Sequence, residues 1–251
     1  MIITYIKPTL NRQSWRMLFR RKQKVLALFS FRFDAHLVPD LIANIDPIVD
    51  GWIGFDDSSA TGVFSSEADR RRSLLQAAKE NGADWVLAVD PDERFEIATA
   101  TKIASLVRTS ERVAWGFNFR ELYSPHEYRV DGIWGEKKRF SLFRMFEPSE
   151  RTDTGLHDNW YPKSGGFRER NCGLNLYHLK MINPARRAAR SNLYKFLDPE
   201  HRYQPMGYDY LADEAGARFE LIPNHRRFNP PHTDDDGLWM FESDKAALDS
   251  E

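Results

Sequence analysis

The order of apolar and amphipathic segments in the first part of the chain constrains the fold most strongly. Three apolar runs, "KVLALFSF" (24–31), "DGWIGF" (50–55) and "ADWVLAVD" (83–90), are predicted to be buried strands. Segments with helical spacing at 36–45 and 66–79 separate these runs. Continuous apolar strands that alternate with helices predict an α/β fold in which helices cover both faces of a mostly parallel sheet.

Both predicted helices carry further helical signals. Leu41 and Ile45 lie four residues apart and therefore on one face of the first helix. Ser66 and Asp69 have the spacing of a capping box at the start of the second, and Gly82 is suited to ending it because glycine tolerates a left-handed backbone.

The second half of the chain has a different pattern. Alternating apolar residues predict strands at 111–122, 139–146 and 172–179, which extend the sheet in a mixed or antiparallel manner. A further helix is predicted at 183–197, with Asn183 as its N-terminal cap.

The composition is that of a soluble globular protein, with 41% hydrophobic and 29% charged residues among 251. No linker divides the chain, so one domain over residues 1–251 is expected. A net charge of −1 predicts no general affinity for nucleic acid. The single cysteine, Cys172, excludes an intrachain disulfide and a zinc site built from cysteines, which suits a cytoplasmic location.

A basic segment at 12–24 carries Trp15, Leu18 and Phe19 among its charges. This pattern is typical of an amphipathic helix that rests on the inner face of a membrane or on an acidic partner. It also fits a solvated helix that docks on the domain through its apolar residues. No apolar run approaches the length of a membrane span, so any membrane contact is expected to be peripheral.

Carboxylates follow the second and third predicted strands. Asp56 and Asp57 end one, and Asp90 and Asp92 end the other. Because ligands bind at the carboxyl ends of parallel strands, we expect both pairs to meet at one rim. Residues two apart on a strand point the same way, so Asp90 and Asp92 could share one Mg²⁺ or Mn²⁺ ion. Glu93 is expected to point away from them, toward supporting groups or solvent. The alternative is an ordinary acidic turn.

The segment "DGWIGFDDSSATG", followed by a helix and then "GADWVLAVDPDERFE", resembles the family 2 glycosyltransferases of the GT-A fold. In that family an aliphatic strand ends in two Asp residues, and a later strand ends in a D-x-D motif. The upstream "ALFSFRFDAHLVPDLIANI" is similar to the family's first strand, loop and helix. Here the usually Asn-Glu-rich loop reads Arg32-Phe33-Asp34. The resemblance covers about 25–96.

This resemblance implies a nucleotide-diphospho-sugar transferase fold and a UDP- or GDP-sugar donor. Residues 25–96 would form the nucleotide-sugar-binding half, and 97–251 the acceptor half. The motif positions imply that Asp57 binds the base while Asp56 supports its loop. Asp90 would face the ribose and the metal, and Asp92 would hold the Mn²⁺ or Mg²⁺ that bridges the diphosphate.

Basic residues could complete this site. Three consecutive arginines, 70–72, point in different directions on a helix, so at most one or two can reach a phosphate, and Arg72 is our candidate. His178 ends a predicted strand, and "YHLKMINPARRAAR" resembles a segment of the same glycosyltransferase branch. It implies His178 as a third metal ligand, although a structural histidine is the alternative. Weaker phosphate candidates are Lys180, Arg186 and Arg190.

The segment "RFSLFRMFEPSERTDTGLHDNWYP" resembles a branch in which "LFR" precedes a "HE" dipeptide. Here the dipeptide is His157–Asp158. An inverting transfer requires a general base beside the acceptor hydroxyl, and Asp158 is the candidate, with Glu136 in reserve. An ordinary turn at Asp158 is the alternative. Three aromatic residues are expected either to stack on sugars or to pack in the core: Trp134, Trp160 and Tyr161.

These observations favour a metal-dependent glycosyltransferase that passes a sugar from a nucleotide-sugar to a carbohydrate or other hydroxyl acceptor, with inversion by single displacement. Two alternatives remain: a metal-dependent nucleotide-diphosphate or phosphoester hydrolase, and a non-catalytic protein that binds nucleotide or carbohydrate. Asp158 and His178 count against the last, because binding alone needs no base.

Overall fold

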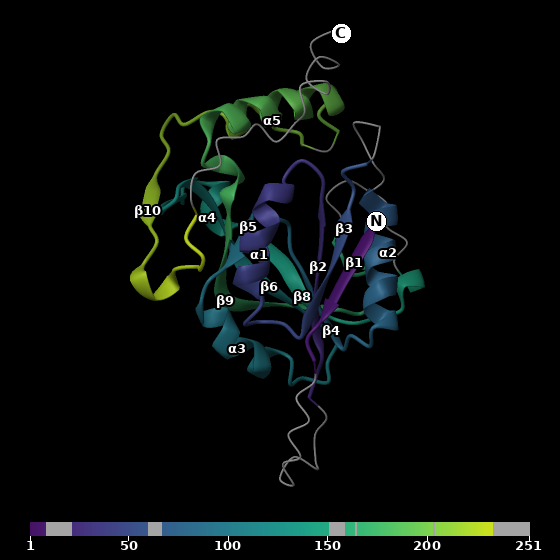
Figure 1. The fold of residues 1–251 in the computed structure, drawn as a ribbon. Helices are drawn as coiled ribbons and strands as arrows, with labels where there is room; N and C mark the ends of the chain where they lie inside the picture. Colours follow the sequence, from purple (N-terminus) through teal and green to yellow (C-terminus); the bar gives the residue numbers. More distant parts are fainter. Residues whose placement is uncertain (9–21, 60–66, 151–158, 164, 203, 233–251) are drawn as a thin grey trace.

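A mixed ten-stranded sheet forms the centre of the protein (Figure 1), in a computed structural model that describes residues 1–8, 22–59, 67–150, 159–163, 165–202 and 204–232. Its strands are β1 (Ile2–Ile6), β2 (Val25–Phe31), β3 (Gly51–Asp56), β4 (Trp85–Ala88), β5 (Glu93–Phe95), β6 (Val113–Ser124), β7 (Glu127–Arg129), β8 (Lys138–Arg144), β9 (Arg168–His178) and β10 (Phe219–Leu221). The α-helices are α1 (Val38–Ile45), α2 (Glu67–Glu80), α3 (Ala98–Leu106), α4 (Ile133–Glu136) and α5 (Pro184–Leu197).

The sheet combines parallel central strands with a mixed extension from the second half of the chain, the arrangement that the sequence predicted. The strand order is β1-β3-β2-β4-β8-β6-β7-β10, and β9 pairs with both β5 and β6. The neighbours β3, β2 and β4 are parallel, as predicted. β1 and β8 flank them in antiparallel pairs, and only β9 beside β6 restores a parallel pair in the second half. The parallel geometry is therefore confined to β3-β2-β4 and to β6-β9.

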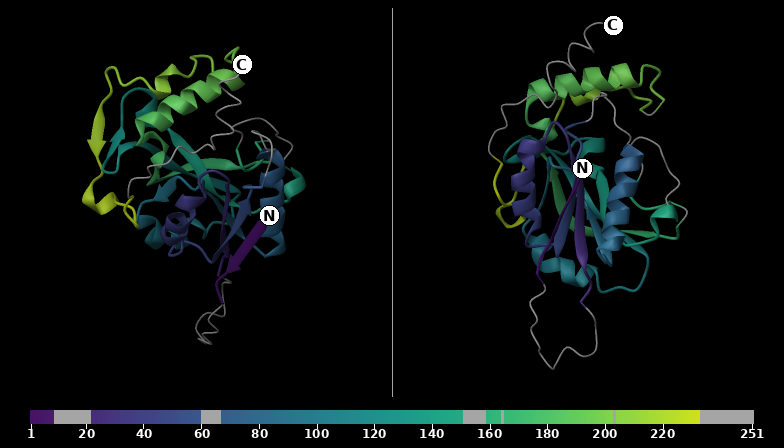
Figure 2. Two further views of the ribbon diagram at one scale, coloured as in Figure 1. Left: turned by 45° about the horizontal axis from the view of Figure 1, so that its top comes forward. Right: turned by 45° about the vertical axis from the view of Figure 1, so that its right-hand side comes forward.

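Helices cover both faces of the central strands (Figure 2). Alternate residues of β2 enter two separate cores, with Phe29 on the α1 side and Leu28 on the α2 side. Leu41 and Ile45 of α1 and Leu74 of α2 are fully buried against these faces. Burial of one such side chain contributes about 1.5–3 kcal/mol, so the apolar stripes read from the sequence account for the helix positions.

Helix α5 lies across the carboxyl ends of the parallel strands (Figure 1). It begins as predicted, because the Asn183 side chain accepts hydrogen bonds from the backbone N–H groups of Ala185 and Arg186. Gly82 after α2 has a φ of +70°, as its predicted role requires. The predicted cap Ser66 and most of the basic segment 12–24 lie outside the described residues. Within the described residues, no helix is long and apolar enough to cross a membrane.

The sequence did not predict β5, although this strand fixes the chain that follows Asp92. One edge of β5 pairs with β9. At its other edge the buried Asn44 of α1 takes the place of a neighbouring strand. The Asn44 amide accepts a hydrogen bond from the Phe95 N–H (2.8 Å) and donates one to the Phe95 carbonyl (3.0 Å).

We predict that Asn44→Ala lowers the free energy of unfolding by about 1–3 kcal/mol, because it leaves two buried backbone groups without partners. Urea denaturation measures the change. Asn192→Ala, on the exposed side of α5, is the control and should shift stability by no more than about 0.5 kcal/mol. Equal effects of the two substitutions would contradict this role for Asn44.

Candidate functional site

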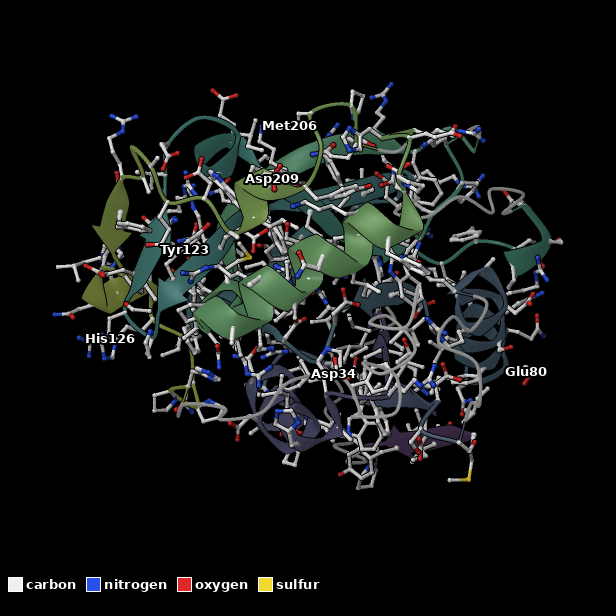
Figure 3. The ribbon with its side chains drawn as sticks, turned by 90° about the horizontal axis from the view of Figure 1, so that it is seen from above. Asp34, Glu80, Tyr123, His126, Met206 and Asp209 are labelled. Atoms are coloured by element: carbon white, nitrogen blue, oxygen red, sulfur yellow. The ribbon has the colours of Figure 1, made fainter. Side chains whose placement is uncertain are left out.

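Carboxylates follow each of the three parallel strands at the end of the sheet covered by α5. Asp34 lies after β2, Asp57 after β3, and Asp90 and Asp92 after β4. Asp34 lies near α5 in the view from above (Figure 3). Burial, together with the charges of Asp92 and Asp90, raises the pKa of Asp34 to about 6. Asp34 therefore belongs to the acidic rim, a role that the sequence did not assign to it.

Asp90 and Asp92 lie in a turn, whereas we expected them to continue a strand and therefore to point the same way. β4 ends at Ala88, and the Glu93 N–H donates to the Asp90 carbonyl (3.0 Å), which closes a turn over these residues. The alternation of side chains along a strand therefore does not apply. Asp90 keeps 44% of its side chain exposed, whereas the Asp92 side chain is 8% exposed.

Arg139 of β8 binds Asp90 and Glu93 together. Its Nη1 lies 2.9 Å from Asp90 Oδ2 and 2.8 Å from Glu93 Oε1. Partial burial raises the pKa of Asp90, but Arg139 outweighs it and the net pKa is lowered. Glu93 was expected to point away from Asp90 and Asp92, toward supporting groups or solvent; solvent is wrong, and Glu93 instead supports Asp90. Glu93 is fully buried and also accepts a hydrogen bond from the Asp90 N–H (2.9 Å), because the turn folds its side chain back over the site.

Asp92 contacts His178, the residue with which we predicted it to share a metal ion. His178 Nε2 lies 3.2 Å from Asp92 Oδ2, and Nδ1 lies 2.7 Å from Glu121 Oε2. All three residues are buried. Burial lowers the pKa of His178, but the two carboxylates outweigh it and raise the pKa overall. Burial raises the pKa of Asp92, and His178, Arg190 and Lys180 hold it well below its usual range.

The backbone fixes this contact as well as the side chains do. In the antiparallel pairing of β5 with β9, Glu93 lies opposite His178. The Leu179 N–H also donates to the Asp92 carbonyl (2.8 Å). The D-x-D turn and the end of β9 are thus attached to each other although they are far apart in the sequence.

Glu121 was missed in the sequence, although a signal was present. Phe117, Phe119 and Glu121 alternate along β6, so a carboxylate falls on the apolar face of a strand. A charged residue at such a position needs a partner when it is buried. Here the partners are His178 and Lys137, whose Nζ lies 3.0 Å from Glu121 Oε1.

Two further cations from the second half approach the acidic rim. Lys180 follows β9, and Arg190 comes from α5; both interact electrostatically with Asp92. Burial, followed by the charge of Arg190, lowers the pKa of Lys180. Lys180 forms no salt bridge with any described residue. The cluster therefore holds cationic charge that a bound anion could contact.

Asp56 orders the start of the loop after β3, and the arginines of α2 are arranged differently from our expectation. The Asp56 carboxylate accepts hydrogen bonds from the backbone N–H (2.9 Å) and hydroxyl (2.5 Å) of Ser58, which lowers its pKa and orders the loop. Arg70 contacts Asp57 (2.9 Å). The candidate Arg72 is instead 56% exposed and pairs with Asp69. Arg71 pairs with Glu67 and lies over the Trp160 ring, and it also acts electrostatically on Asp90.

The remaining candidates are the predicted bases and three aromatic residues. His157 and the predicted base Asp158 lie outside the described residues. The reserve base Glu136 is exposed on α4. The three aromatic residues that could have stacked on sugars are buried in the core, at 3%, 7% and 2% exposure: Trp134, Trp160 and Tyr161.

The spacing of Asp92 and His178 fits a divalent cation. Adjacent ligands of an octahedral ion with bonds of about 2.1 Å lie about 3 Å apart, close to the 3.2 Å between Asp92 Oδ2 and His178 Nε2. Oxygen with imidazole nitrogen suits Mn²⁺, and carboxylate oxygen also suits Mg²⁺. In the described part of the chain, no three His, Cys, Asp or Glu side chains are placed to hold a metal. Water and phosphate oxygens would therefore supply the other ligands.

No family model matches the sequence, and no curated protein matches it. Among solved structures, one that is similar is a glycosyltransferase involved in the glycosylation of the major capsid of PBCV-1, with 13% identity and a TM-score of 0.41 over 66% of this chain and 98% of that one. Another is A197 from STIV, with 15% identity and a TM-score of 0.35 over 62% and 85%. Likenesses at this level do not establish a shared fold or function.

The raised pKa of Asp34 predicts a pH-dependent stability. The pKa is about 6 in the folded protein and 3.8 ordinarily, so ionisation is less favourable in the folded state. The free energy of unfolding should therefore fall as the pH rises from about 4 through 6. Asp34→Asn removes this effect while its side-chain oxygen keeps the bond from the Arg32 N–H. From pH 4 to 7, the variant should gain about 1–2 kcal/mol relative to the unaltered protein in urea denaturation. If the two proteins differed in free energy of unfolding by the same amount at every pH, the raised pKa of Asp34 would be contradicted.

Proposed function

We propose that the protein is a metal-dependent glycosyltransferase of the GT-A fold that uses a nucleotide-diphospho-sugar donor. The contact between Asp92 and His178 at the carboxyl ends of the parallel strands carries this proposal. It joins the D-x-D turn to the histidine of the second half, which are the two elements that the resemblance to family 2 glycosyltransferases requires. Asp34, Lys180 and Arg190 surround this contact with charge of both signs.

The mixture of charges suits a diphosphate. Asp92 and His178 would hold a divalent cation, which when bound stabilises the negative charge that develops on the diphosphate as the glycosidic bond breaks. Lys180 and Arg190 would contact the phosphate oxygens directly. A purely acidic rim would repel such a leaving group, so the cations that follow β9 and lie on α5 are as necessary as the carboxylates.

The nucleoside would bind along the loops after β3 and β4. In this arrangement Asp57, oriented by Arg70, binds the base, and the Asp56–Ser58 bonds keep that loop in place. Asp90 remains partly exposed and faces the ribose and the metal, with Arg139 fixing its carboxylate. Arg71 replaces Arg72 as the arginine of α2 that serves the donor.

The chemical step follows from a donor held in this way. The acceptor, a carbohydrate or another hydroxyl compound, loses its proton to the predicted base Asp158. Its oxygen attacks the anomeric carbon from the face opposite the diphosphate. The bond from this oxygen to the anomeric carbon forms while the bond from that carbon to the nucleoside diphosphate breaks. The nucleoside diphosphate leaves, and the configuration at the carbon is inverted.

We predict that Asp92→Asn weakens Mn²⁺-dependent binding of UDP or GDP at least about tenfold, because a neutral amide is a poor ligand for a divalent cation. Isothermal titration with and without a chelator measures this effect. Asp213→Asn, at an exposed carboxylate, is the control and should bind normally. If neither the chelator nor Asp92→Asn changes nucleotide affinity, the proposal is wrong.

Asp158→Asn should separate binding from catalysis. Removal of a general base is expected to slow sugar transfer by about 10²–10⁴-fold while nucleotide affinity stays unchanged. Transfer rates with a panel of nucleotide sugars, beside the same titration, measure both quantities. Normal transfer by the variant would place the base elsewhere.

A further inference from the structure

Glu121 lies behind His178, on the side of the ring opposite Asp92. We propose that Glu121 is a positioning residue, which holds the imidazole so that Nε2 faces Asp92 and a divalent cation. This inference rests on the proposed function, because it assigns a role to a residue of the same site.

The geometry allows Glu121 to fix both the rotation and the tautomer of the ring. Nδ1 lies 2.7 Å from Glu121 Oε2, and the two side chains are 6% and 1% exposed. The Phe119 ring packs beside the imidazole, with ring centroids 4.8 Å apart. With Nδ1–H donated to the carboxylate, the lone pair of Nε2 is the one left for a metal, as in carboxylate–histidine–metal arrangements.

Glu121 is itself held in place. Its second oxygen, Oε1, lies 3.0 Å from Lys137 Nζ, and this ammonium lies 4.0 Å from the centre of the Trp134 ring. Both carboxylate oxygens are therefore engaged, one by Lys137 and one by His178. Glu121 is accordingly assigned to orient the histidine and not to bind the cation directly.

A structural role alone does not account for a charge at this position. β6 and β9 are already joined by a parallel ladder in which Glu121 and His178 are partners. The side chains add a buried ion pair to this backbone pairing, and burial of a carboxylate costs several kcal/mol before its partners offset it. What the side chain adds is control of the imidazole.

The test compares Glu121→Ala with Glu121→Gln, whose carbonyl oxygen can still accept the Nδ1–H bond. Free Mn²⁺ measured by electron paramagnetic resonance gives the affinity of each full-length variant. We expect Glu121→Ala to bind Mn²⁺ about 10–100-fold more weakly and Glu121→Gln to stay within about threefold of the unaltered protein. Glu80→Gln, at the edge of the molecule (Figure 3), is the control and should not change affinity.

A double-mutant cycle distinguishes positioning from a general structural effect. In a His178→Ala background, Glu121→Ala should cause no further loss of Mn²⁺ affinity, because the residue acts through the imidazole. The same further loss in both backgrounds would overturn the inference, as would normal affinity in Glu121→Ala alone.

A measurement without metal covers the case in which Glu121→Ala does not fold well. A protected imidazole Nδ1–H resonance of His178 should be present in the unaltered protein and in Glu121→Gln, and its absence from both would overturn the inference. If the resonance is present but the unaltered protein binds no Mn²⁺, the metal site fails together with this role. If the unaltered protein binds Mn²⁺ and Glu121→Ala binds it equally, the role of Glu121 alone fails.

Discussion

The contact between the buried side chains of Asp92 and His178 connects the two halves of the chain. It lies at the carboxyl ends of the parallel strands, where the acidic residues are found. Backbone pairing of β5 with β9 and the Leu179 N–H bond to the Asp92 carbonyl hold the two residues in register. The remaining features of the site are arranged around this contact. Glu121 and Lys137 lie behind it, Arg139 binds the turn that carries Asp92, and Arg190 of α5 interacts electrostatically with Asp92.

Electrostatic balance explains why the site needs both halves of the chain. The loops after the parallel strands supply acids, and burial together with the charges of Asp92 and Asp90 raises the pKa of Asp34. The second half supplies the compensating cations: Arg139 on β8, Lys180 just after β9, and Arg190 on α5. Under the proposed function, such a site would hold a divalent cation and an anionic phosphate together, because each ligand satisfies charges of the opposite sign.

The sequence predicted the central strands and helices well, because continuous apolar runs and helical periodicity are strong local signals. It predicted the site less completely. β5 is short and begins Glu93-Arg94, so no apolar run marks it. Asp90 and Asp92 were expected to be parallel because a strand was assumed where a turn occurs. The contact of His178 with Asp92 was foreseen only through the resemblance, since it depends on strand pairing between distant segments.

The most direct test of this account is a crystal structure of the protein with Mn²⁺ and UDP or GDP. The account predicts an anomalous manganese peak about 2.1 Å from both Asp92 Oδ2 and His178 Nε2, with the diphosphate between this ion and Lys180. A nucleotide bound elsewhere would contradict it. So would a manganese peak that excludes His178 while the imidazole still contacts Asp92.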